Sequence, residues 1–471
     1  SQAAAQRART RAAQQAIQRV RRGRPLTRLK EVQLVHVVRL AAPAGLTREV
    51  NVALHMLQRR RRLHPRLALR AAIAAAGVGE DARIVALLTR ARTRYPRKVP
   101  SALRYHRARA LERSGKLSKA CAAYDDLSHD SHAGDYYRIW AKARLQSLTT
   151  SSSASECKPP RPFEAVAASG LNQVPSLADI EALTTPLRAL AKRHAKAYPW
   201  LKRAADLIDL GEFALAADEM HEAYLAWRAA RGRTLRGAGL EAVYRGTART
   251  RRYVPWKLKR ARRALSEADV RLLAKAARRL GDMGTAVGFA GQAWLRQRPR
   301  AYRAQVHQAA QAHGLDPNLL FAVMRVESIY HRRIVSYAGA VGLMQIMPGT
   351  GRRIAQQLEM RDFNTAALLE PHTNLRFAAW YLASLLERFD GRLPLAIASY
   401  NGGPHNVRQW MQNQSPDMPL DAFLERIPFT QTHRYVRRVL THYAAYRAQE
   451  GLAVPELHLK LPAIKPDDVA F

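Results

Sequence analysis

The chain has little cysteine, few strand signals and no long apolar run. Its only two cysteines, Cys121 and Cys157, are too few for a disulfide framework and lack the spacing of metal ligands, so we expect no bound metal. In an oxidising compartment the two could form a single bridge, and the sequence leaves this open. No stretch of about eighteen apolar residues occurs, so we expect no transmembrane helix. The first residue, Ser1, does not reveal whether an export signal was removed.

Acidic residues are also scarce, since 37 Asp and Glu stand against 78 Lys and Arg, a formal net charge of +41. The excess lies in residues 1–300, which hold 60 of the basic and 23 of the acidic residues. Such a field attracts polyanions, of which nucleic acid is the commonest. No nucleic-acid-reading motif accompanies it, and clusters such as Lys259 to Arg263 lie on helical patterns that suit a solvated face. We therefore do not expect nucleic acid as the partner.

Alanine, leucine and arginine abound, and apolar residues recur at helical spacing nearly throughout, which predicts an all-α fold. Three stretches read as helix, glycine turn and helix, with the turns at Gly115, Gly211 and Gly281. The turns are unevenly spaced, so they indicate a loose array of helical hairpins and no strict tetratricopeptide repeat. Such arrays usually make a curved scaffold.

The best linker is the serine- and proline-rich stretch from Thr149 to Pro162. We expect the chain to be divided into a basic N-terminal arm or helix over residues 1–30, a helical-hairpin array over 31–148, the linker over 149–162, a continuation of the array over 163–299, a second helical domain over 300–450 and a C-terminal tail over 451–471.

Glu327 is the most informative residue of the second domain. Asp316 and Pro317 form an N-cap and a first helical position. One apolar stripe of the helix then contains Leu320, Val323, Met324 and Glu327. A carboxyl on that stripe faces a core or a cleft, and desolvation raises its pKa, which keeps a carboxylic acid protonated near neutral pH for use as a general acid.

A run rich in small residues, from Ser336 to Thr350, follows this glutamate. Small residues let backbone approach a ligand closely, so the run suits a cleft wall. Gln345 in it offers an amide donor and acceptor that match sugar hydroxyl and acetamido groups. Further on, an apolar helix ends in a turn that begins with Tyr400 and Asn401.

In this order, the segments resemble the sequence blocks of the soluble lytic transglycosylases, which belong to the goose-type lysozyme-like superfamily. The blocks are Glu327-Ser328, Gly339 to Gln345, Tyr400-Asn401, and Leu424 to Phe429 followed by Arg434-Tyr435-Val436. The similarity runs from about Tyr302 to about Arg447. It implies a lysozyme-like α domain over residues 300–450, preceded by a helical superhelix.

The resemblance also implies roles for single residues. Glu327 would be the catalytic acid and base, with Tyr400 close to its carboxyl, and no cofactor is expected. Six residues match positions that line the glycan groove: Ser336, Met344, Gln345, Tyr400, Asn401 and Glu425. Two residues depart from the family pattern, Ser399 where alanine is frequent and Gln431 where glutamate is frequent, and they bear more on fine substrate preference than on chemistry.

Only one carboxylate stands in a convincing motif, which favours participation of the substrate's own acetamido group. The resemblance then implies a peptidoglycan lytic transglycosylase that cleaves between N-acetylmuramic acid and N-acetylglucosamine and leaves 1,6-anhydro ends. A muramidase that hydrolyses the same bond with a base such as Asp362 or Glu370 stays open. So does a noncatalytic basic scaffold that binds a polyanion or a protein.

The expected partner is the peptidoglycan glycan strand, whose anionic stem peptides suit the basic N-terminal region. The helical array could also bind other cell-wall proteins. The corresponding location is the periplasm or the cell envelope.

Overall fold

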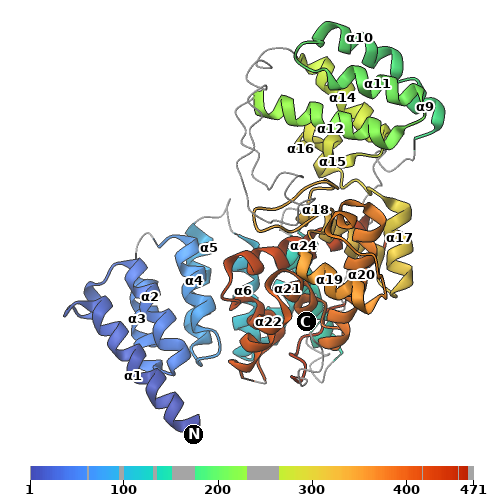
Figure 1. Cartoon of the computed structure of the whole chain (residues 1–471). Coiled ribbons are helices and arrows are strands. Elements are labelled where there is room, and N and C mark those ends of the chain that lie inside the picture. Colours follow the sequence, from blue (N-terminus) through green and yellow to red (C-terminus); the bar gives the residue numbers. More distant parts are fainter. Residues whose placement is uncertain are drawn as a thin grey trace. The chain divides into compact units, whose positions relative to one another are not determined.

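The computed structural model describes residues 2–60, 63–94, 100–130, 135–150, 157, 175–230, 265–415, 417–453 and 456–464. Most of these residues lie in the helices labelled in Figure 1. Within the described ranges, β structure is limited to three isolated bridges, which confirms the all-α fold. Most of the predicted linker and the basic cluster from Lys259 to Arg263 lie outside the described residues.

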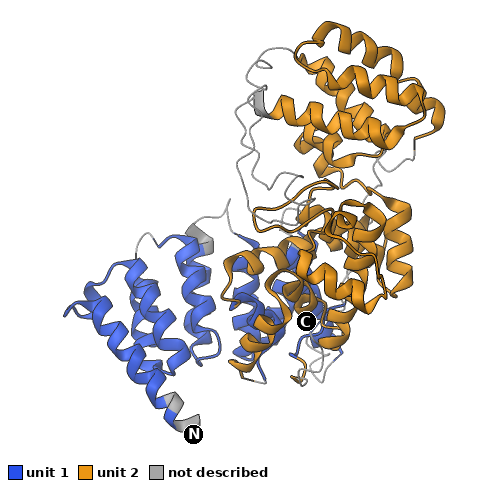
Figure 2. Cartoon of the chain, viewed as in Figure 1, with its two compact units in different colours: residues 1–164, 417–426, 454–461 blue, residues 165–416, 427–453, 462–471 orange. Residues whose placement is uncertain are grey.

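The chain forms two compact units, coloured separately in Figure 2. Unit 1 comprises residues 1–164, 417–426 and 454–461, and unit 2 comprises residues 165–416, 427–453 and 462–471. Two short C-terminal segments therefore belong to the unit that begins the chain. The sequence-based boundaries at residues 30, 148, 162, 299 and 450 stay predictions.

Unit 1 contains the helices α1 (Gln2–Arg21), η1 (Leu26–Arg28), α2 (Glu31–Ala41), η2 (Ala42–Ala44), α3 (Thr47–Arg59), α4 (Pro65–Ala75), α5 (Asp81–Arg94), α6 (Ser101–Arg113), α7 (Leu117–His129), α8 (Asp135–Thr149) and α23 (Leu420–Glu425). Consecutive helices pack against each other, and apolar residues from α1 to α6 form one buried cluster. The helical hairpin around Gly115 is confirmed, because α6 ends just before this glycine, α7 begins just after it, and the two helices pack together.

All three predicted glycine turns share one backbone geometry. At the first, Gly115 has φ 73° and the amide of Lys116 donates to the Leu111 carbonyl at 3.0 Å, which is the hydrogen bond of a Schellman cap. A left-handed residue there favours glycine, because it has no Cβ to clash with the backbone. The turns at Gly211 and Gly281 repeat the positive φ and the same hydrogen bond.

A buried ionic cluster holds α23 within unit 1. The carboxylate of Asp421 accepts hydrogen bonds from Tyr105 at 2.8 Å, from Arg109 at 2.7 Å, and from Arg144. Arg109 also pairs with Glu112 at 2.7 Å. The two cations and two carboxylates balance each other, so the cluster buries no uncompensated charge.

Two further links close unit 1. Cys121 of α7 and Cys157 form a disulfide, with their Cα atoms 5.6 Å apart, which answers the question that the sequence left open. The amide of Leu420 donates to the Leu459 carbonyl at 2.8 Å, so part of the predicted C-terminal tail lies against the start of α23.

Unit 2 contains the helices α9 (Leu177–Glu181), α10 (Thr184–His194), α11 (Trp200–Asp209), α12 (Phe213–Ala230), α14 (Glu267–Arg279), α15 (Met283–Ala290), α16 (Gln292–Arg296), α17 (Arg303–Ala312), α18 (Pro317–Glu327), α19 (Pro348–Gln357), η7 (Thr365–Leu369), α20 (Pro371–Arg388), α21 (Leu393–Gly402), α22 (Pro404–Gln412) and α24 (Thr430–Gln449). Helices α11 with α12 and α14 with α15 form the two remaining predicted hairpins. Among the described helices of both units, none combines the length and apolarity needed to cross a bilayer.

Candidate active site

Glu327 is the last residue of α18, a helix whose beginning is fixed by Asp316. One carboxylate oxygen of Asp316 accepts from the amide of Asn318 at 2.8 Å, and the other accepts from Tyr443 at 2.9 Å and pairs with Arg447. Residues 318–325 of the helix are all buried. The predicted N-cap is therefore confirmed, and the buried helix presents Glu327 at its end with the side chain only partly exposed.

The turn after Glu327 is strained and firmly held. Ile329 and Tyr330 both have positive φ, 52° and 67°, a region that non-glycine residues rarely adopt. Tyr330 is fully buried, and its hydroxyl is 2.6 Å from that of Tyr446 and 3.3 Å from the guanidinium of Arg325. Strain held by buried contacts is frequent at functional sites, where it fixes a reactive group in place.

The surroundings of Glu327 raise its pKa to about 7. Burial is the largest cause, since it disfavours the charged carboxylate. Tyr435 and Arg438, both on α24, act in the opposite direction. Among the described residues, no second carboxylate is a cause of this shift. The carboxyl is therefore able both to donate and to accept a proton near neutral pH.

Two tyrosines lie next to this carboxyl. The pKa of Tyr435 is raised well above 10 by burial and then by the charge of Glu327, and the same two causes act in the same order on Tyr400. Both hydroxyls therefore stay protonated. Tyr400 donates to the Met344 carbonyl at 2.8 Å. The Tyr435 hydroxyl lowers the pKa of Glu327, but it forms no hydrogen bond of full geometry with any described group.

The loop that carries Met344 and Gln345 is tightly closed. Val341 and Ile346 pair as an antiparallel bridge, with amide-to-carbonyl distances of 2.9 and 3.1 Å. Between them, Gly342 has φ 80°, and a Cβ there would lie 2.2 Å from the Leu368 carbonyl, so no larger residue fits. This close approach is the reason that the sequence block needs a glycine at position 342.

Asn374 of α20 connects this loop to the helices. It is fully buried, accepts from the Met344 amide at 2.7 Å, and donates to the carbonyls of Leu368 at 2.8 Å and Val341 at 3.1 Å. The sequence interpretation missed both Asn374 and the contact of Tyr435 with Glu327. For Tyr435 a signal existed, since it lies in the fourth sequence block. A lone asparagine within a helix gave none.

The predicted groove residues of the loop differ in what they can offer to a ligand. Ser336 accepts from the Ala340 amide at 2.9 Å, so its hydroxyl closes a tight turn. Met344 is fully buried beneath the loop surface. Gln345 is half-buried with φ 52°, and its amide nitrogen donates to the carbonyls of Gly342 at 2.9 Å and Ile334 at 3.2 Å, which leaves its oxygen for another donor.

Asn401 lies beside Tyr400 in the last turn of α21 and accepts from Thr432 of α24 at 2.9 Å. Ser399 is fully buried within α21, so this departure from the family pattern lies beneath the site. Gln431, the other departure, is exposed in the first turn of α24. Helices α18, α21 and α24 thus hold Glu327, Tyr400 and Tyr435 together.

Glu425 is the one predicted site residue outside unit 2. It lies at the end of α23 in unit 1, where its carboxylate accepts from Tyr137 at 3.1 Å and is 4.0 Å from His106. Asp362 and Glu370, the candidate bases of a muramidase, are both exposed. Within the described chain, no cluster of three or more His, Cys, Asp or Glu side chains could hold a metal ion.

Comparison with known proteins agrees with this geometry. Residues 305–418 match the family model of the Transglycosylase SLT domain. The C-terminal region carries an SLT domain. The matched residues include α18 with Glu327, the Gln345 loop and α21 with Tyr400. Glu425 and Tyr435 follow the matched segment.

Curated relatives match about a third of this chain. The soluble lytic murein transglycosylase of Salmonella typhimurium is 35% identical over 170 residues, which is 35% of this chain and 26% of that protein. The protein of the same name from Escherichia coli is 33% identical over the same length and coverage. The similarity thus spans about a quarter of these relatives' length.

Two solved structures share the fold over most of the chain. One is the complex of the 70-kDa soluble lytic transglycosylase with bulgecin A, with a TM-score of 0.57, 21% identity, and coverage of 97% of this chain and 64% of that one. The other is an inactive mutant of lytic transglycosylase Slt from Pseudomonas aeruginosa, with a TM-score of 0.54, 22% identity, and coverage of 90% and 59%. They support the all-α architecture around the SLT domain.

Proposed function

We propose that this protein is a peptidoglycan lytic transglycosylase and that Glu327 is its single catalytic acid and base. The observation that carries the proposal is a carboxyl whose pKa is raised to about 7 by burial, at the end of a rigid helix inside an SLT domain. An acid that must first donate and later accept a proton works best with a pKa near the working pH.

In the proposed reaction, Glu327 donates its proton to the glycosidic oxygen between N-acetylmuramic acid and N-acetylglucosamine. The bond from that oxygen to the anomeric carbon breaks, while the 2-acetamido oxygen of the muramoyl residue attacks the same carbon to form an oxazolinium ion. The muramoyl C6 hydroxyl then displaces the acetamido oxygen and gives its proton to the Glu327 carboxylate. The product carries a 1,6-anhydro ring, Glu327 regains its proton, and no water is consumed.

The absence of a carboxylate partner for Glu327 among the described residues supports this route over hydrolysis. A retaining or inverting glycosidase places two carboxyls on either side of the scissile bond. Asp362 and Glu370 are exposed, and neither contributes to the pKa of Glu327. An intact acid with its full tyrosine environment likewise argues against a noncatalytic scaffold.

The remaining site residues receive supporting roles in this proposal. Gln345 offers its free amide oxygen, and Asn401 its amide nitrogen, to substrate hydroxyl or acetamido groups. Ser336 and Met344 act through the shape of the loop, and Tyr400 supports that loop through the Met344 carbonyl. Glu425 stays a predicted groove residue.

We further propose that the protein works in the cell envelope, where its substrate is found. The disulfide between Cys121 and Cys157 supports an oxidising compartment. Binding of other cell-wall proteins by the helical array stays a prediction.

Product analysis tests the function directly. Purified cell wall is digested with the full chain in water enriched in heavy oxygen, and the new sugar ends are examined by mass spectrometry. We expect 1,6-anhydromuramic ends without solvent oxygen. Labelled reducing ends would assign the protein to the muramidases.

A further inference from the structure

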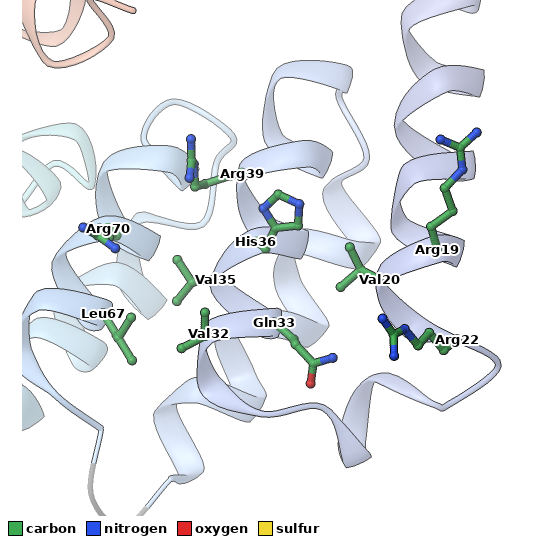
Figure 3. A pocket seen from close by; sticks show the side chains of 10 residues that line it. All are labelled: Arg19, Val20, Arg22, Val32, Gln33, Val35, His36, Arg39, Leu67 and Arg70. Carbon is green, nitrogen blue, oxygen red and sulfur yellow. The ribbon is translucent and has the colours of Figure 1, made fainter. Parts of the chain in front are cut away.

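Unit 1 has a pocket of its own, which opens between α1, α2 and α4 (Figure 3). Its cavity volume is about 470 Å³, within the range of pockets that hold small ligands. Every lining residue belongs to unit 1, and none belongs to the SLT domain.

The rim of this pocket is strongly cationic. Four arginines line it: Arg19, Arg22, Arg39 and Arg70. Figure 3 shows Arg19 and Arg22 on one side of its central valines and Arg39 and Arg70 on the other. All four are exposed, and no acidic residue lines the pocket. Among the described residues none of the four forms an ion pair, so their charge is available to an anion.

The floor of the pocket is aliphatic. Val32 and Val35 lie on one face of α2, and Leu67 approaches from α4. Val32 is 65% exposed and Leu67 is half-buried, whereas Val35 is buried beneath them. The floor therefore offers apolar surface that a bound ligand would remove from water.

This combination selects among anionic ligands. No Phe, Tyr or Trp lines the pocket, so it offers no surface on which a sugar ring or a nucleic-acid base could stack. A membrane surface is broad, whereas the arginines surround a concave space. A short peptide with several carboxylates separated by methyl and methylene groups matches both the rim and the floor.

We propose that this pocket binds the acidic stem peptides of peptidoglycan, as a site separate from the glycan-cleaving one. The guanidinium groups pair with the peptide carboxylates, and Val32, Val35 and Leu67 cover its short aliphatic groups. The choice of this peptide source rests on the proposed function, whereas the acidic-peptide chemistry rests on the pocket alone. Such a site would hold peptide-bearing wall on the protein between cleavage events.

Calorimetry with a synthetic stem tetrapeptide, alanyl-γ-glutamyl-diaminopimelyl-alanine, tests the site on the full chain. The double variant Arg39→Gln/Arg70→Gln should weaken binding roughly 100-fold, about tenfold for each lost charge-assisted pair. The matched control Arg48→Gln/Arg66→Gln removes the same charge from exposed positions of α3 and α4 that do not line the pocket. It should change the dissociation constant about twofold at most, because screened charges at a distance contribute little.

A second variant, Val32→Ser, tests the floor without changing the charge. It should weaken binding about tenfold, because it removes apolar contact. Equal losses in the pocket and control double variants, or no binding by the native chain, would overturn the proposal. A native chain that binds anionic lipid vesicles through these arginines but does not bind the tetrapeptide would also overturn it. The measurement involves no glycan cleavage, so its failure would leave the transglycosylase assignment intact, and missing anhydro products would leave the peptide site intact.

Discussion

Asp421 in unit 1 and Glu327 in unit 2 are two carboxyls that burial affects with opposite results. Asp421 in unit 1 is 4% exposed, and although burial alone would raise its pKa, Arg109 and Arg144 hold that pKa well below its usual range. Glu327 in unit 2 has only Tyr435 and Arg438 to oppose burial, and its pKa rises to about 7.

The difference shows that the charges and hydrogen bonds around a buried carboxyl, and not burial alone, decide its protonation state. Asp421 keeps its charge at every physiological pH and serves as a fixed structural link. At Glu327 the interactions with Tyr435 and Arg438 are too weak to offset burial, so the carboxyl can be protonated near neutral pH. A group that transfers protons needs such a pKa. Changes at each position should therefore affect different properties of the protein.

The largest expected effect follows from Glu327→Gln, which keeps the shape of the side chain but removes the transferable proton. Turnover of glycan strands should fall by about two to four orders of magnitude, the usual contribution of a general acid, while glycan binding is retained. Rates of product formation on purified wall measure this. Glu370→Gln is the matched control at an exposed position, and a comparable loss there would favour the hydrolase alternative.

Asp421→Asn should act on stability and leave two buried arginines without their shared carboxylate. We expect the unfolding of unit 1 to become easier by about 3 to 5 kcal/mol, as when one partner of a buried ion pair is removed. Urea denaturation followed by circular dichroism measures the change. Asp417→Asn, at an exposed position of the same segment, should have almost no effect. Similar curves for both variants would refute a structural role for the cluster.

Phenylalanine variants of the two tyrosines near Glu327 should differ in how their activity depends on pH. Tyr435 lowers the pKa of Glu327, so Tyr435→Phe should move the acidic group of the pH–rate profile to higher pH. Tyr400→Phe should instead lower turnover about tenfold with less effect on binding, because it removes one hydrogen bond to the loop at Met344. Identical profiles for the two variants would show that the hydroxyls are not distinguishable in this way.

The smallest expected effect is on the stability of unit 2. A carboxyl whose pKa is raised in the folded state binds its proton more tightly there, so its contribution to stability is lost as pH rises from about 4.5 to about 7. Glu327→Gln removes that loss and should stabilise unit 2 at pH 8 by about 1 to 2 kcal/mol, after allowance for partial exposure. Melting curves at pH 8 and pH 4.5 provide the measurement, and equal differences at both would contradict the raised pKa.

Local signals made much of this architecture predictable from sequence. The hairpin turns at Gly115, Gly211 and Gly281 are each specified within a few residues, as is the cap that Asp316 provides for α18. The block from Gly339 to Gln345 contains one residue that the structure shows to be irreplaceable, because a Cβ at Gly342 would lie 2.2 Å from the Leu368 carbonyl.

The remaining features depend on partners far apart in the sequence. Asp421 meets Arg144 across 277 residues, and nothing near either residue indicates the other. For the same reason the sequence could not show that Glu425 lies in unit 1 or that Asn374 binds the Met344 loop. The disulfide was left open because only tertiary structure brings Cys121 and Cys157 together.

The long sequence separation within the ionic cluster also fixes how late in synthesis the cluster can form. Arg109 leaves the ribosome 312 residues before Asp421, a delay of roughly 15 to 60 s at about 5 to 20 residues per second. By the end of that time most of unit 2 has been made, whereas unit 1 has until then lacked the segment whose carboxylate neutralises its buried arginines. The ionic cluster of unit 1 can therefore form only after the segment of residues 417–426 has been made, and a chain that stops before residue 417 would lack parts of both units.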